Sequence, residues 1–350
     1  MRILMVTDAW KPQVNGVVHT LERLSEALAD RGVETRFLTP LDFGTRFPLP
    51  TYPDIQIALT TPGHVGAVIE SARADHVHLV TEGPLGWMAR RYCRRKGRPF
   101  TTSYHTKFPE YLSARLPVPQ KLAYDWLRTF HNSGTGTLVA THSLADDLTR
   151  RGFKKLRPWT RGVDSTLFRP DRRKDFGVKG PIFLCAGRVA VEKNLPAFLD
   201  LQLPGTKVII GEGPELDRLK ALYPEVRFLG RLPTEELADW YASADVFVFP
   251  SMTDTFGNVI IEALASGTPV AAFPVTGPID IIRNGIDGAL SKDLREAALS
   301  ALNIDRARAR QRALEFNWSA CGQMFLDVVD ESLRGRPRSS STSALPIMST

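Results

Sequence analysis

Cysteine is scarce in this sequence, and long uninterrupted apolar runs are missing from it. The three cysteines are odd in number and far apart, so we expect neither a disulfide framework nor a paired-cysteine metal site. The longest apolar stretch, Asn258 to Val275, is interrupted by charged, glycine and proline residues, which excludes a transmembrane helix. The apolar residues 3–6 are too few for a secretion signal. We therefore expect a cytoplasmic protein, soluble or peripheral to a membrane.

The overall composition is that of a folded protein. Hydrophobic residues make up 43% and charged residues 24% of the chain, close to the averages of globular proteins. The length of 350 residues exceeds what one core of ordinary size holds. Two domains are the first expectation.

Positive charge is concentrated in the first half of the chain. Residues 1–175 hold 27 Lys and Arg against 17 Asp and Glu, a net charge of +10, whereas the remainder holds 18 against 21, a net charge of −3. Basic surfaces attract nucleic acids, anionic lipids and anionic substrates alike. The charge alone therefore leaves the partner open.

Short apolar runs alternate with amphipathic segments in both halves of the sequence. This alternation predicts α/β domains with parallel sheets, whose ligands bind at the carboxyl ends of the strands. We expect strands at residues 1–7, 33–39, 74–80, 100–104 and 137–140, and again at 182–186, 207–210, 226–229, 246–249 and 270–273. Helices are expected between them, notably at residues 17–31, 86–96, 216–223, 234–242 and 258–266.

The domain boundaries follow from changes in composition. A stretch rich in Arg, Asp, Pro and Gly is typical of a linker, and a Ser-, Pro- and Arg-rich end is typical of disorder. We expect a first Rossmann-like domain, a linker, a second Rossmann-like domain, a C-terminal helix and a disordered tail, at residues 1–165, 166–180, 181–318, 319–334 and 335–350.

The strongest functional pattern follows the expected strand at 246–249. Residues 250–263 read Pro-Ser-Met-Thr-Asp-Thr-Phe-Gly-Asn-Val-Ile-Ile-Glu-Ala. The free N–H groups and the dipole of a helix that starts after Gly257 favour an anion. Asp254 and Glu262 add carboxylates, which accept hydrogen bonds from neighbouring hydroxyls. The segment predicts a site for an anionic, hydroxyl-rich ligand.

This segment resembles the E-x7-E motif of the retaining GT-B glycosyltransferases of family 4, the group 1 type. Other landmarks follow in the family's order, so the resemblance covers nearly the whole chain. They are Asn15-Gly16-Val17, His105-Thr106, Gly187-Arg188, Glu192-Lys193-Asn194, Gly211-Glu212-Gly213-Pro214 and Phe316-Asn317-Trp318. The resemblance implies the GT-B fold, two Rossmann-like domains facing across a cleft, and an enzyme that uses a nucleotide diphosphate sugar as its donor.

The resemblance also implies roles for donor-site residues. The backbone of Gly16 would contact the diphosphate, and Arg188 and Lys193 would neutralise its charge. Glu262 would hold the ribose. Further donor contacts would come from Leu232 in the base-binding loop and from the segment Thr255, Phe256, Gly257, Asn258 and Val259.

The catalytic residues implied by the resemblance are Asp254 and His105. Asp254 would hold hydroxyls of the donor sugar. Many relatives have Glu at this position, which leaves the identity of the sugar open. His105 matches the family's donor-side histidine, although a histidine at the end of a strand is more often a structural hydrogen-bonding group. The family's retaining chemistry, a front-face substitution, uses no covalent nucleophile.

No metal or cofactor is expected. The sequence has no D-x-D triplet, the metal-binding carboxylate pair of the other large glycosyltransferase fold, so cationic side chains and helix N-termini must meet the diphosphate charge. The nucleotide sugar itself is a substrate. His76 and His78 look like paired metal ligands, but we expect them to point to opposite faces of a strand and predict no metal site there.

Donor and acceptor are predicted from weaker patterns. The base-binding loop implied at residues 230–234 has no carboxylate able to accept hydrogen bonds from guanine, which favours uridine. The basic segment 90–98, with interleaved aromatic residues, suits an anionic membrane or is simply a solvated helix face. The apolar loop 43–52 lies in the same basic half. The expected acceptor or membrane residues are Phe47, Arg90, Arg91, Arg94, Arg95 and Lys107.

Three further segments, residues 81–86, 103–112 and 274–278, resemble bacterial glycosyltransferases that make glycosyl diacylglycerols. We therefore expect transfer of a hexose or hexuronic acid from a UDP-linked donor to a lipid such as diacylglycerol, at the inner face of the membrane and without nucleic acid. One alternative is a GDP-mannose-dependent mannosyltransferase acting on a lipid or polysaccharide. Another is a non-catalytic nucleotide- or nucleic-acid-binding regulator, which leaves the two motif carboxylates and the histidine without a role.

Overall fold

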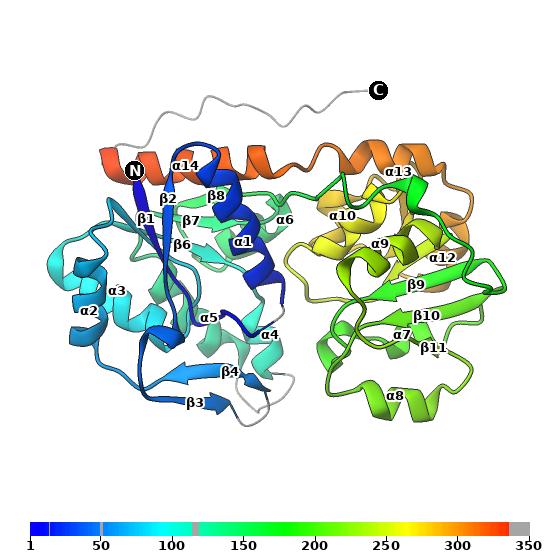
Figure 1. Ribbon diagram of the computed structural model, residues 1–350, viewed down its shortest axis with the longest axis horizontal. Helices are drawn as coiled ribbons and strands as arrows, with labels where there is room; N and C mark the ends of the chain where they lie inside the picture. Colours follow the sequence, from blue (N-terminus) through cyan, green and yellow to red (C-terminus); the bar gives the residue numbers. More distant parts are fainter. Residues whose placement is uncertain (14, 50–51, 114–118, 336–350) are drawn as a thin grey trace.

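The computed structural model describes residues 1–13, 15–49, 52–113 and 119–335. Two α/β domains lie side by side along the long axis of the molecule (Figure 1). Each is built on a six-stranded parallel sheet with helices on both faces. The expected class of two doubly wound Rossmann-like domains is confirmed.

The sheet of the first domain reverses its strand order between β1 and β5. The spatial order is β2 (Glu34–Leu38), β1 (Arg2–Val6), β5 (His76–Leu79), β6 (Phe100–Tyr104), β7 (Gly136–Val139) and β8 (Leu156–Pro158). Its helices are α1 (Gly16–Ala29), α2 (Pro62–Ser71), α3 (Pro84–Lys96), α4 (Phe108–Ser113), α5 (Gln120–His131) and α6 (His142–Arg150). The loops at the carboxyl ends of β1 and β6 face the second domain.

The sheet of the second domain reverses between β9 and β12. Its order is β11 (Arg227–Phe228), β10 (Thr206–Ile210), β9 (Ile182–Ala186), β12 (Val246–Phe249), β13 (Val270–Ala272) and β14 (Gly288–Leu290). The helices are α7 (Pro196–Leu199), α8 (Leu216–Leu222), α9 (Thr234–Ser243), α10 (Asn258–Ala265), α11 (Pro278–Ile281), α12 (Leu294–Ala301) and α13 (Arg306–Ala313). Ligands of such sheets bind where the order reverses, and the loops after β9 and β12 carry most of the expected donor residues.

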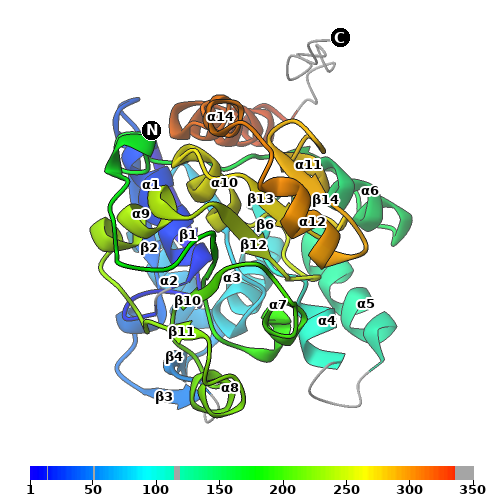
Figure 2. The ribbon, with the colours of Figure 1, turned by 90° about the vertical axis from the view of Figure 1, so that its right-hand side faces the viewer.

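The chain ends by returning to the first domain. Helix α14 (Trp318–Arg334) runs along that domain (Figures 1 and 2) and packs against α1. Its residues Cys321 and Phe325 share a buried cluster with Leu21 of α1, and the Trp159 indole donates to the Cys321 carbonyl over 3.2 Å. The tail predicted for 335–350 lies, beyond Gly335, outside the described residues.

The expectation of an apolar loop at residues 43–52 is wrong in two respects. Residues Arg46–Leu49 form β3, which pairs antiparallel with β4 (Tyr52–Ala58). The Phe43 side chain is buried in the core, because it packs with the apolar residues under the hairpin, whereas Phe47 is 46% exposed. Only Phe47 of these two side chains faces solvent.

His76 and His78 share one face of β5, which corrects the expectation that they point apart. Residues two apart on a strand lie on the same face, and a ring nitrogen of each lies 2.8 Å from the Thr101 hydroxyl. Burial lowers the pKa of His76 to about 3 and that of His78 well below its usual value, so both rings are neutral. They form part of a buried hydrogen-bonded network.

Candidate functional site

Helix α10 starts at the carboxyl edge of the second sheet, directly after the loop that follows β12. Gly257 at its N-cap has φ of +98°, and a Cβ there would lie 2.9 Å from the Ile260 side chain, so the turn into the helix requires glycine. The first N–H groups of a helix have no partner within the helix. The N-terminus of α10 is therefore able to bind an anion.

Helix α1 of the first domain faces α10. The Asn15 side chain caps α1 by accepting from the N–H groups of Val17 and Val18, each over 3.0 Å. A Cβ added to Gly16 would lie 3.7 Å from Nδ2 of the Asn258 side chain, so the first residues of the two helices approach across the domain boundary. Two positive helix ends at one place suit a diphosphate.

An ion pair joins the loops that follow β9 and β12. The Lys193 ammonium lies 2.6 Å from Asp254 Oδ1. The other oxygen, Oδ2, is buried and has no hydrogen-bond partner among the described residues. Lys193, which the resemblance assigns to the diphosphate, thus pairs with the carboxylate that the resemblance assigns to the donor sugar. Arg188 is exposed on the same loop. A carboxylate whose second oxygen has no hydrogen-bond donor is able to accept a hydrogen bond from a ligand hydroxyl.

Glu262 lies on α10, above the core of the second domain. Its Oε2 accepts a hydrogen bond from the buried Tyr241 hydroxyl over 3.2 Å. Burial raises the pKa of Glu262 to about 7, and the bond from Tyr241 offsets only part of this effect. The carboxyl group is therefore poised to gain or lose a proton near neutral pH.

His105 contacts the second domain through its backbone. Its carbonyl accepts from the Thr255 hydroxyl over 2.7 Å. Its Nε2 lies 2.8 Å from the Ser103 hydroxyl and its Nδ1 lies 3.5 Å from the Arg161 guanidinium. Burial and the Arg161 cation hold the pKa of His105 well below its usual value. The imidazole is thus a neutral, anchored ring, and the carbonyl is the group at the domain boundary.

Two further contacts cross the domain boundary. Helices α11 and α6 lie next to each other (Figure 2). Asp280 on α11 accepts from the Ser143 N–H over 2.9 Å and from the Ser143 hydroxyl, so a carboxylate of one domain caps α6 of the other. The Thr141 hydroxyl donates to the Thr255 carbonyl over 3.4 Å. The sequence reasoning missed Ser143 and Asp280, because nothing local in the sequence pairs residues 137 positions apart.

Lys107 lies on the loop after β6, next to this boundary. Burial lowers the pKa of its ammonium, and the carboxylates of Glu110 and Asp254 act against that shift. Lys107 is therefore close enough to both to interact with their charges. The structure thus brings Gly16, Asn258, Thr255 and His105 together with Lys107, Lys193 and Asp254.

Other expected site residues lie elsewhere. Leu232 is half-buried in the loop between β11 and α9, where it packs against the core of the second domain. Phe256 is buried in the core of the second domain. Phe47 is on β3, and Arg91, Arg94 and Arg95 are exposed on α3.

The expectation that Arg90 contacts a membrane is wrong. Only 7% of this residue is exposed, because its guanidinium turns inward between α3 and α5. It donates to the Ser133 hydroxyl over 2.7 Å and to the Thr129 carbonyl over 2.9 Å, and it covers the Trp87 ring. The Trp87 side chain is itself partly buried and packs against the core of the first domain.

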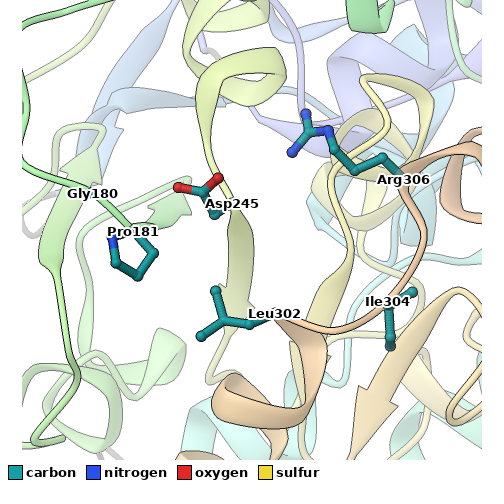
Figure 3. A pocket seen from close by; sticks show the side chains of 6 residues that line it. All are labelled: Gly180, Pro181, Asp245, Leu302, Ile304 and Arg306. Carbon is teal, nitrogen blue, oxygen red and sulfur yellow. The ribbon is translucent and has the colours of Figure 1, made fainter.

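A surface pocket of about 370 Å³ lies at the opposite edge of the second sheet, before β9 and β12 (Figure 3). Its two charged side chains already serve the fold. Asp245 accepts from the Ile182 N–H over 2.8 Å, and Arg306 donates to the carbonyls of Ala242 and Ala244, each over 2.6 Å. This pocket is therefore not part of the candidate site. None of the helices in the described part of the chain has the length and apolar character needed to span a bilayer.

Family models match most of both domains. Residues 14–167 match the model described as Glycosyltransferase Family 4, and residues 180–304 match the model described as Glycosyl transferases group 1. A solved structure of Anabaena HepE in complex with UDP and glucose has a TM-score of 0.73 at 18% identity, covering 95% of this chain and 100% of that chain. The GT-B fold is confirmed.

Curated relatives extend the match to full-length enzymes. A "GDP-mannose-dependent alpha-mannosyltransferase" of Corynebacterium glutamicum is 31% identical over 83% of this chain and 76% of its own. An "Alpha-monoglucosyldiacylglycerol synthase" of Streptococcus pneumoniae is 27% identical over 86% of this chain and 78% of its own. Together with the motif carboxylates and the facing helix N-termini, these matches show that the chain belongs to the family 4, group 1 glycosyltransferases.

Proposed function

We propose that this glycosyltransferase transfers a hexose from a nucleoside diphosphate sugar to a membrane lipid, with retention of the anomeric configuration. The observation that carries the proposal is the meeting of the α1 and α10 N-termini beside the Lys193–Asp254 pair. The helix ends bind the diphosphate, and Asp254 Oδ2 accepts from a hydroxyl of the sugar. Glu262 accepts from the ribose.

Charge at this site is balanced without a metal. On diphosphate binding, Lys193 and Arg188 supply the cations, and the N-terminus of α10 supplies oriented N–H groups. At α1 the Gly16 N–H does so, because the N–H groups of Val17 and Val18 already donate to Asn15. As the bond to the sugar breaks, negative charge grows on the leaving phosphate, where these groups stabilise it. We expect full activity in EDTA. A strict requirement for a divalent cation would contradict this scheme.

Two nucleotide sugars are candidates for the donor, GDP-mannose and a UDP-linked hexose. Several relatives at 31% identity are named as GDP-mannose-dependent, which supports GDP-mannose. The loop at residues 230–234 offers no carboxylate for guanine, which supports a UDP-linked hexose. We favour GDP-mannose, because the relatives match over most of both domains and the loop argument concerns a single contact.

A lipid acceptor is supported by an exposed apolar surface on α4 and α5, made of Phe108, Leu122 and Trp126. Trp126 stacks on Trp87 at 4.9 Å between ring centroids. Arg91 lies one helical turn beyond Trp87 and is exposed, so cationic and aromatic groups adjoin. Such a combination suits the interface of an anionic bilayer. The sequence reasoning placed the aromatic part of this surface on α3, where the rings are packed inward.

The experiment that tests the function offers the protein GDP-mannose, UDP-glucose and UDP-glucuronic acid in turn, with vesicles that contain diacylglycerol. Release of nucleoside diphosphate and the lipid product are both measured. We expect one donor to give a glycolipid with the donor's anomeric configuration. Transfer only to a soluble sugar would rule out the lipid acceptor, and an inverted product would rule out retention.

Membrane docking is tested by sedimentation with vesicles. We expect binding that requires anionic lipid, weakens with salt and drops when Arg91, Arg94 and Arg95 are changed together to Ser, since each basic residue contributes about 1 kcal/mol near such a surface. A matched variant changes three exposed cations of the second domain to Ser, namely Lys220, Arg227 and Arg308. Equal loss of binding in both variants would contradict docking through α3.

A further inference from the structure

Glu110 in the first turn of α4 has one oxygen that is hydrogen-bonded and one that is buried without a partner. Its Oε1 accepts from the Tyr124 hydroxyl of α5 over 2.6 Å. Tyr124 is 4% exposed, so this bond fixes the carboxylate from inside the domain. The other oxygen, Oε2, is buried and has no hydrogen-bond partner among the described residues.

Asp254 in the second domain has the same arrangement as Glu110 in the first domain. There Lys193 holds Oδ1, and Oδ2 is the buried oxygen without a partner. The hydrogen bond from Thr255 to the His105 carbonyl places the loop that carries Asp254 against the loop that leads into α4. Two carboxylates, each anchored through one oxygen, therefore flank the same domain boundary.

A buried carboxylate oxygen without a donor is costly, by about 1 to 3 kcal/mol or more for a charged group. Asp254 Oδ2 and Glu110 Oε2 both lie near the domain boundary without a donor. A ligand that donates hydrogen bonds to them removes this unfavourable free energy. A hydroxyl is such a donor. Asp254 has a ligand under the proposed function, the donor sugar, whereas Glu110 has none assigned.

We propose that Glu110 Oε2 accepts a hydrogen bond from a hydroxyl of the acceptor's headgroup, so that residues 107–110 form the acceptor subsite opposite the donor sugar. This inference rests on the proposed function and adds the acceptor-binding residue to it. The exposed ring of Phe108, two positions from Glu110, lies where the apolar part of a lipid acceptor leaves the subsite. Lys107 balances the charge of the two carboxylates.

The test is Glu110→Gln. An amide oxygen still accepts from Tyr124, so the fold is preserved, but the amide presents N–H groups where the hydroxyl needs an acceptor. We expect the KM for the lipid acceptor to rise about 10- to 150-fold, the range for a hydrogen bond to a charged group. The dissociation constant of the nucleoside diphosphate and the slow hydrolysis of the donor by water should change less than twofold.

Two further variants sharpen the result. Glu70→Gln is the matched control, because Glu70 also accepts from a tyrosine hydroxyl, that of Tyr92 over 3.0 Å, on an exposed face of the same domain. Glu70→Gln should leave unchanged the KM for the acceptor, the dissociation constant of the nucleoside diphosphate and the rate of donor hydrolysis. Tyr124→Phe frees Oε1 and should raise the acceptor KM, but by less than Glu110→Gln.

Two results would overturn the inference while leaving the proposed function intact. One is an unchanged acceptor KM in Glu110→Gln. The other is a parallel loss of nucleotide binding and transfer, which would make Glu110 a structural residue. If the wild-type chain transfers to no lipid from any nucleotide sugar, the proposed function fails and this inference fails with it.

Discussion

At the scale of single residues, the Lys193–Asp254 ion pair joins the side chains that we propose bind the diphosphate and the donor sugar. Lys193→Ala removes a cation from the donor site and leaves both oxygens of Asp254 without a donor. We expect kcat/KM to fall about 10- to 150-fold, corresponding to about 1.5 to 3 kcal/mol for a charge-assisted contact. Steady-state kinetics check this, with far-ultraviolet circular dichroism to verify the fold. Near-native kinetics would remove Lys193 from the site.

Glu262 gives a prediction about pH. Its pKa is about 7 in the folded chain against an ordinary value of 4.5, so the folded state keeps a proton that the unfolded state releases between those values. Stability therefore falls as the pH rises from about 4.5 to 7. Glu262→Gln removes the titration and should be more stable than the wild type above pH 7, by about 3 kcal/mol, with the difference vanishing below pH 4.5.

The same variant should bind nucleoside diphosphate more weakly, because an amide cannot accept two hydrogen bonds from the ribose as a carboxylate can. Denaturant unfolding across the pH range and calorimetric titration measure the two effects. Opposite signs for stability and binding are expected of a ligand-binding residue. Parallel unfolding profiles for the two proteins would contradict the shifted pKa.

Residues in local motifs could be predicted from the sequence, and residues that act through distant contacts could not. Asp254 and Gly16 lie next to short signatures, and the structure places both at the domain boundary. Arg90 looked like a surface cation, but its partners lie in α5 and in the turn that follows it, about 40 positions away. Asp280 carried no local signature, because its role depends on which helix lies opposite. Glu110 lies within the segment 103–112, but nothing in that segment assigned it a role.

At the scale of elements, α13 anchors the C-terminus of α10. The Arg310 guanidinium donates to the Ala265 carbonyl at the end of α10 over 2.6 Å, and to the carbonyls of Ser165 and Phe168 over 2.8 and 2.7 Å. Arg310→Ala leaves three half-buried carbonyls without this donor. We expect a loss of about 3 kcal/mol in unfolding free energy and weaker nucleotide binding, because the proposed diphosphate site lies at the N-terminus of α10.

Arg308 on the same helix supplies the control, since it is exposed. Arg308→Ala should change stability by less than about 0.5 kcal/mol, as surface substitutions usually do. Chemical denaturation of both variants gives the comparison. Similar values for the two would show that α13 does not anchor α10 through Arg310.

Regular elements of the second domain followed closely from periodicity. The strand expected at 182–186 is β9 with the same bounds, and the helix expected at 258–266 ends one residue earlier as α10. The β3–β4 hairpin could not be predicted, because its Pro- and Arg-containing strands lack a clear alternation. The packing of α14 on the first domain is a tertiary contact that no pattern within residues 319–334 encodes.

At the scale of the whole molecule, Ser143 and Asp280 join the two domains in the arrangement seen here. Asp280→Ala removes the carboxylate that caps α6 across the boundary. We expect the domains to separate more readily, with a larger radius of gyration by small-angle scattering and a donor KM raised about 5- to 10-fold, in line with the loss of roughly 1 kcal/mol of interdomain hydrogen bonding. An unchanged radius with an unchanged KM would mean that other contacts hold the domains together.

The most direct measurement for the whole account is a calorimetric titration of nucleoside diphosphate into the wild type and Gly16→Val. A valine side chain at position 16 projects toward Asn258, into the space between the two helix N-termini where the diphosphate is proposed to bind. The matched control is Gly63→Val, which alters the N-terminus of α2 in the same domain. The account predicts at least a tenfold loss of affinity for Gly16→Val, with Gly63→Val and both melting temperatures unchanged. Undiminished binding by Gly16→Val would contradict it.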